Sequence, residues 1–119
     1  MSDELVIFLA TGLVSMSAAL SAGALNKLPE ADKPEYLKNQ NGLVTVMVLG
    51  NLAALTLIGA LAFGFSRPDL AWWIPLSCVF FSFPVVHFVV IQRLLGDLRN
   101  VFVSGSLAAL SIPVLWWSW

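Results

Sequence analysis

The sequence predicts an all-α integral membrane protein, a bundle of four transmembrane helices, and two observations support this fold class. First, 59% of the 119 residues are hydrophobic and only 11% are charged, whereas a soluble domain carries roughly a quarter charged residues. Second, nearly every charge lies between apolar stretches that reach the length of about 20 residues needed to cross a bilayer. The mean hydropathy of +0.87 agrees. We therefore expect a single transmembrane domain over residues 1–119, with the lipid bilayer as its first partner.

Four apolar stretches qualify as spans, at about residues 5–25, 43–65, 70–91 and 101–119. None of them contains Asp, Glu, Lys or Arg, and short polar loops separate them. The chain starts with MSDE, which holds two acids and no Lys or Arg. Because a signal peptide needs a positively charged start, we expect the first stretch to be a retained span.

The positive charges predict the orientation of the spans. Of the six Lys and Arg residues, five lie in the first and third loops and only Arg67 lies in the second. Since cytoplasmic loops carry the excess of positive charge, both termini should face the non-cytoplasmic side. Arg93 should anchor the cytoplasmic end of the third span, where Asp97 can pair with it one turn later. The interface anchors expected at the outer ends are Trp72, Trp73, Trp116, Trp117 and Trp119. Because the chain is compact with short loops, we expect it to be a protein of a bacterial inner membrane.

Small residues predict where the spans pack. Helices in lipid approach each other closely at Gly, Ala and Ser, commonly spaced four residues apart. The first span has such a row in Ser15, Ala19 and Gly23, and the second has Gly50 and Ala54. We expect these two spans to form an antiparallel pair. The third span is rich in Phe instead, so part of it should face lipid or a partner.

Two polar residues inside spans are candidate contact sites, His87 and Asn51. A polar ring within a membrane needs a partner. Candidate partners for His87 at similar depth are Asn51, Thr45 and Ser104. The imidazole can be a neutral hydrogen-bonding group between helices, a proton or ligand contact, or a single ligand to haem or metal. Asn51 is expected to join helices, and Asn100 to cap the fourth span.

Catalytic signatures are missing from the sequence. The chain has one His and no carboxylate inside a span, so it cannot form a nucleophile–base–acid set there. Its single cysteine, Cys78, cannot form a disulfide within the chain. The net charge of −1 and the absence of a basic patch argue against nucleic-acid binding. We expect no catalytic residue, no cofactor and no metal. The expected function is a non-enzymatic subunit or accessory factor of a larger membrane complex. The alternative is a homo-oligomeric channel or small-solute transporter that uses a polar centre around His87 and Asn51.

Overall fold

The computed structural model describes residues 3–68 and 70–118, and every element in those ranges is helical, which confirms the predicted all-α fold. Three spans are continuous α-helices: α1 (Asp3–Lys27), α3 (Gln40–Ser66) and α7 (Asp97–Ser118). The third span, Trp73–Leu95, is one helix made of five consecutive pieces. These pieces are α4 (Trp73–Ser77), η2 (Cys78–Ser82), α5 (Phe83–Val86), η3 (His87–Ile91) and α6 (Gln92–Leu95). The first loop holds two short turns, η1 (Glu30–Asp32) and α2 (Glu35–Lys38).

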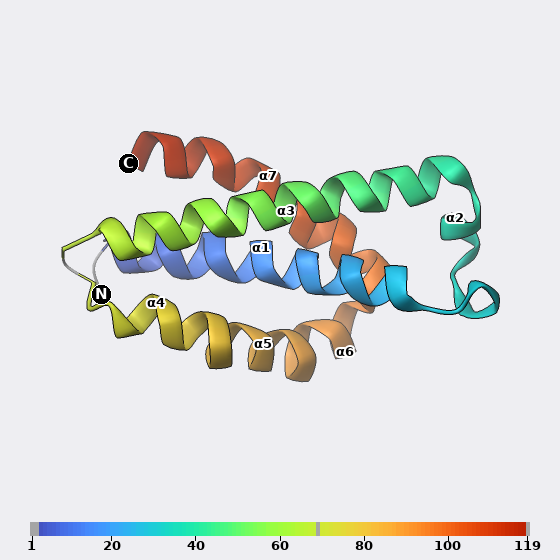
Figure 1. Ribbon diagram of the computed structural model, residues 1–119, viewed down its shortest axis with the longest axis horizontal. Coiled ribbons are helices and arrows are strands. Elements are labelled where there is room, and N and C mark those ends of the chain that lie inside the picture. The colour runs from blue at the N-terminus through green and yellow to red at the C-terminus, as the bar shows by residue number, and fades with distance from the viewer. Residues whose placement is uncertain (1–2, 69, 119) are drawn as a thin grey trace.

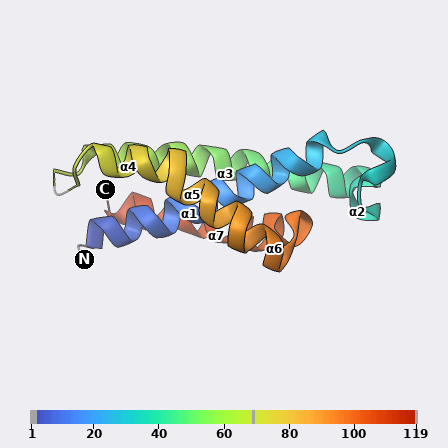
Figure 2. The same ribbon diagram turned by 90° about the horizontal axis from the view of Figure 1, so that it is seen from below.

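The four long helices alternate in direction, so the ends labelled N and C lie at the same end of the bundle (Figure 1). Helix α1 is central, with α3 on one side and the third span on the other. Figure 2 shows α7 alongside α1. Within the described residues, these four helices are long and apolar enough to cross a membrane. The chain is therefore a small multi-pass membrane protein in its architecture.

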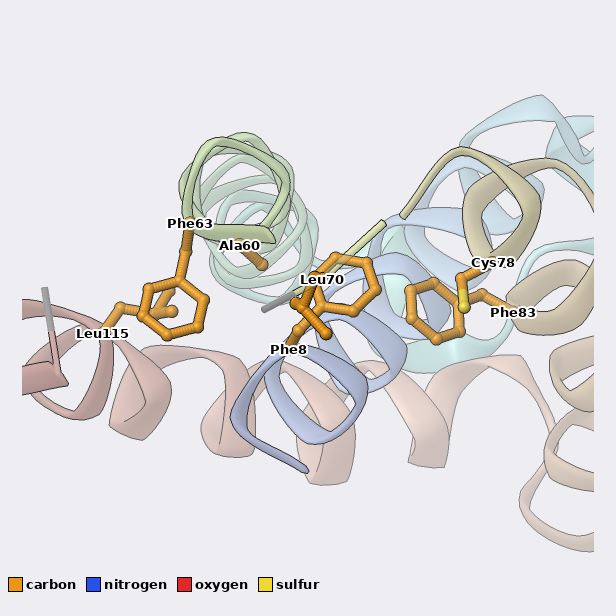
Figure 3. Packing of buried hydrophobic residues seen from close by; sticks show 7 residues of the cluster. All are labelled: Phe8, Ala60, Phe63, Leu70, Cys78, Phe83 and Leu115. Carbon is orange, nitrogen blue, oxygen red and sulfur yellow. The ribbon is translucent and has the colours of Figure 1, made fainter. Parts of the chain in front are cut away.

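The buried core has three levels along the bundle. Aromatic rings fill the level near the termini: the Phe8 and Phe83 rings lie with their centroids 5.7 Å apart, and Phe63 of the same cluster lies beside Leu115 (Figure 3). In the middle, Ala18, Ala53 and Ala108 lie against each other, which brings α1, α3 and α7 close together. Leu25, Leu37, Val46 and Val101 form the level near the first loop. The small middle level gives the polar side chains described below room to cross between helices.

The third span contains two π-helical turns, one on each side of α5. The backbone N–H of Phe83 donates to the carbonyl of Cys78, five residues earlier, and Gln92 bonds His87 in the same way. Pro84 explains the first wide turn, because proline has no N–H and its ring collides with the carbonyl four residues before it. The buried side chains of the span follow this geometry: Cys78 and Phe83 are five residues apart instead of the usual three or four.

The small-residue rows lie on facing parts of α1 and α3. A Cβ added to Gly50 would be 2.7 Å from the Cβ of Ala22, so the two backbones approach closely there. Ser15 is buried, and its hydroxyl donates to the Thr11 carbonyl in its own helix. Ala19, Gly23, Gly50 and Ala54 instead border a hollow of about 300 Å³ between α1 and α3.

The first loop packs onto the bundle through two of its side chains, Leu37 and Tyr36. Helix α2 is a single turn after Pro34, and Leu37 is buried against Leu25 and Val46. Tyr36 packs edge-on against Phe102 of α7, with ring centroids 5.3 Å apart. The Trp72, Trp73, Trp116 and Trp117 side chains are exposed at the end of the bundle where the termini lie. Trp119 lies outside the described residues, and Arg93 is exposed in α6 at the opposite end.

Candidate functional site: a buried polar network between three spans

His87 is fully buried and faces α1. Its exposed fraction is 0%, and its Nδ1 lies 2.6 Å from the hydroxyl oxygen of Ser17. The partner is therefore Ser17 rather than Asn51, Thr45 or Ser104. The Thr45 hydroxyl donates to the Asn41 carbonyl within α3. The first π turn gives the reason why His87 points at α1, because the five-residue step at Cys78–Ser82 rotates every later residue of the span about the helix axis.

Asn100 is the centre of the network, and it does not cap the fourth span. Helix α7 already begins at Asp97, so Asn100 lies inside it and is fully buried. Its side-chain nitrogen donates to the hydroxyls of Ser17 and Ser21, both at 2.8 Å, and to the Ser17 carbonyl at 3.2 Å. Its side-chain oxygen accepts a hydrogen bond of 2.6 Å from the Ser104 hydroxyl. One amide thus binds α7 to α1 through several contacts.

The network continues from Asn100 to the end of the bundle that holds the first loop. The Ser21 hydroxyl donates to Asp97 Oδ1 at 3.0 Å. The Gln92 amide of α6 donates to both carboxylate oxygens of Asp97, at 3.0 and 3.2 Å. Asp97 thus bonds Gln92 and Ser21, and not the Arg93 expected from the sequence, because the helix breaks at Gly96. Asp97 also borders a surface hollow of about 550 Å³.

The hydrogen bonds around Ser17 indicate which nitrogen of the His87 ring carries the proton. The Ser17 carbonyl can only accept, so the nitrogen of the Asn100 amide must face it. The Ser17 hydroxyl accepts from that nitrogen and has its own hydrogen left for His87 Nδ1. With the Ser17 hydroxyl donating to Nδ1, a neutral ring carries its proton on Nε2. Nε2 is buried and has no hydrogen-bond partner among residues 3–68 and 70–118.

Asn51, the second candidate from the sequence, lies elsewhere. It is exposed on α3, beside the hollow between α1 and α3. No hydrogen bond is formed by its side chain among the described residues. The structure therefore does not bring His87 and Asn51 into one polar centre.

The network is built to join helices. It connects α1, α7 and the third span through hydrogen bonds whose donors and acceptors nearly all pair with each other. Within residues 3–68 and 70–118, no group of three or more His, Cys, Asp and Glu side chains lies close enough to hold a metal ion. The chemistry that these side chains provide is positional, because each interhelical bond restricts the rotation and sliding of one span against another.

A sequence pattern that could have revealed this network is the spacing of its polar residues. Ser17 and Ser21 are four residues apart, and so are Asn100 and Ser104, so each pair shares one helix face. From the sequence, Asn100 is expected to cap the fourth span, and Ser104 is only a candidate partner of His87. Two polar pairs at helical spacing in different spans indicate an interhelical network more directly than one isolated His.

The fold and the network together define a multi-pass membrane protein whose spans are joined by a buried polar cluster. Comparison with protein-family models, with curated proteins and with solved structures finds no match to this chain. Its function is therefore inferred from the geometry above.

Proposed function

We propose that this chain is a non-enzymatic subunit or accessory factor of a larger membrane assembly. The observation that carries the proposal is the one-sided packing of the third span. Over an apolar stretch of 18 residues, only 22% of that span is buried, against 39% of a stretch of the same length in α1. It packs chiefly on α1 and presents Phe80 and Phe81, which are 66% and 70% exposed.

The polar network supports the same proposal. A subunit needs a rigid surface, and the bonds of Asn100, Ser17 and His87 hold the third span in one rotation against α1. The exposed aromatic face is thereby presented in a defined direction. Because aromatic rings bury large areas at little conformational cost, a partner helix gains much from covering such a face.

A photo-crosslinking experiment tests the proposal. A photoreactive amino acid replaces Phe81 in the full chain, which is expressed in the membranes of its source organism. The matched control carries the same group at Leu110 of α7, which is 67% exposed. We expect a discrete protein adduct from position 81 that is absent from position 110. Adducts with lipid alone at both positions contradict the proposal.

For the orientation, we propose a bacterial-type inner membrane with both termini on the non-cytoplasmic side, supported by the Lys and Arg count of the loops. Single cysteines at Lys33 and Pro68, in a chain with Cys78→Ser, report on it. An impermeant thiol reagent added outside intact cells should label position 68 and not position 33. Labelling of position 33 alone reverses the orientation.

A second candidate function, a channel or small-solute transporter, is favoured by one observation. His87 Nε2 is buried without a partner in the described part of the chain, at the inner end of a row of hydrogen-bonded polar side chains that reaches the hollow beside Asp97. Such groups in membranes often handle protons or solutes. Purified protein in vesicles containing a pH-sensitive dye tests this function. Proton flux that His87→Phe abolishes and Thr45→Val leaves intact supports the channel, and flux no faster than in empty vesicles rejects it.

A further inference from the structure

The outer face of α3 carries a regular stripe of exposed side chains with one amide in it. Its members lie alternately three and four residues apart, which is the spacing of a seam between two helices. They are Val48, Asn51, Leu55, Ile58, Ala62 and Phe65, all exposed. We call this set the α3 stripe. It lies on the opposite side of α1 from the third span (Figure 1), so it is distinct from the surface invoked under the proposed function.

The side-chain amide of Asn51 is energetically unfavourable at its position in the membrane. It lies about 16 Å from the start of α3 and about 22 Å from its end, at 1.5 Å per residue, so either end places it inside the hydrocarbon. Its amide makes no hydrogen bond among the described residues. In hydrocarbon no water can replace the missing partner, and an unpaired amide is strongly unfavourable. The environment of Asn51 is therefore incomplete in the single chain.

We propose that the α3 stripe binds the α3 stripe of a second copy of this chain, with the two Asn51 amides hydrogen-bonded to each other. Copies of one membrane protein insert in the same direction, so a two-fold axis along the membrane normal makes the two α3 helices parallel. Identical residues then meet at the same depth. A primary amide both donates and accepts, so Asn51 is complementary to itself.

The hollows on both sides of the α3 stripe can accommodate side chains from the α3 helix of a second copy. Asn51 borders the hollow of about 300 Å³ between α1 and α3. Leu55 borders a second hollow of about 650 Å³ between α3 and α7, which Ile112 and Trp116 also line. A parallel partner helix places its own exposed side chains into such hollows as knobs into holes. Lipid tails would fill them less specifically and leave Asn51 unpaired.

Cysteine cross-linking tests the geometry. In a Cys78→Ser chain, Leu55→Cys is compared with Leu110→Cys, an equally exposed position on α7. In oxidised membranes we expect Leu55→Cys to form a disulfide-linked homodimer at least tenfold faster than Leu110→Cys. Equal rates overturn the proposal. So does cross-linking of position 55 to a protein of a different mass, which would make the occupant another chain.

The affinity test isolates the amide. Energy transfer between donor- and acceptor-labelled chains is measured in liposomes over a range of protein-to-lipid ratios. Asn51→Leu should weaken association by about 3- to 30-fold, the effect of one or two interhelical hydrogen bonds in membranes. Asn51→Gln, which keeps the amide, should retain most of the affinity. Unchanged association of Asn51→Leu overturns the pairing. The crosslink from position 81 is unaffected by either result, so this inference and the proposed function fail separately.

Discussion

Replacing Asn100 with Leu tests whether the polar network stabilises the bundle. The substitution keeps the approximate volume and removes the amide that donates to the Ser17 and Ser21 hydroxyls at 2.8 Å. Interhelical hydrogen bonds in membranes contribute about 0.6 kcal/mol on average and up to about 1.7 kcal/mol. Two such bonds give an expected loss of about 1–3 kcal/mol in the free energy of unfolding. The longer contact with the Ser17 carbonyl adds little to this sum.

The chain supplies its own reporter for the measurement. Cys78 is a buried free thiol in the aromatic part of the core. Its reaction with a maleimide in mixed micelles of rising dodecyl sulfate content therefore follows the opening of the bundle. The control is Thr45→Val, which removes a hydroxyl that bonds only within its own helix, to the Asn41 carbonyl. We expect Thr45→Val to change the free energy by less than about 0.5 kcal/mol.

If the bundle of Asn100→Leu opens at the same dodecyl sulfate content as that of the unmodified chain, the polar network does not stabilise the bundle. The same conclusion follows if Thr45→Val costs as much as Asn100→Leu, because general polarity, and not the interhelical bonds, would then set the stability.

The same thiol assay checks three further expectations. Gly12→Ala should destabilise the bundle by about 1–3 kcal/mol, because the new Cβ would lie 2.7 Å from Cε2 of the buried Phe83 ring. Gly23→Ala is the control and should be neutral or slightly stabilising, because a Cβ there has nothing within 4 Å. Equal effects of the two substitutions would contradict the close approach of Phe83 to Gly12. Gly96→Ala should cost about 1–3 kcal/mol, since Gly96 has a φ of 75° and open space around it, and an unchanged opening curve would contradict this backbone strain. Ser17→Ala should cost about 1–3 kcal/mol because it leaves His87 Nδ1 buried without a partner, and an effect as small as that of Thr45→Val would mean that the contact is dispensable.

The spans could be predicted from the sequence because hydrocarbon imposes a simple requirement on length and polarity. Each predicted span overlaps one helical segment, but the bounds differ: the third segment runs over Trp73–Leu95 instead of 70–91, and α7 starts at Asp97 instead of Val101. The earlier start of α7 follows from Gly96, whose positive φ ends α6 and lets the next helix begin at once. A hydropathy pattern has no information about such a turn.

The polar network could be predicted only in part. His87 was recognisable as a buried group in need of a partner, but the partner depends on which face of the third span meets α1. That face depends on the first π turn, which changes the spacing of buried residues from four to five at Cys78 and Phe83. A regular helical period therefore pairs His87 with Phe80, which the structure leaves 66% exposed. The presence of Pro84 indicated a disturbance of the helix but not its size.

Each π turn also means that the third span contains one residue more than a regular helix of the same rise and rotation would need. Deleting one residue between Cys78 and Ser82 can therefore convert that turn to ordinary α-helix while His87 keeps its direction toward Ser17. An insertion or deletion in α4 or α5, the regular pieces before His87, would instead turn His87 by about 100° away from Ser17. The wide turn is thus the place in this helix where chain length can vary without loss of register.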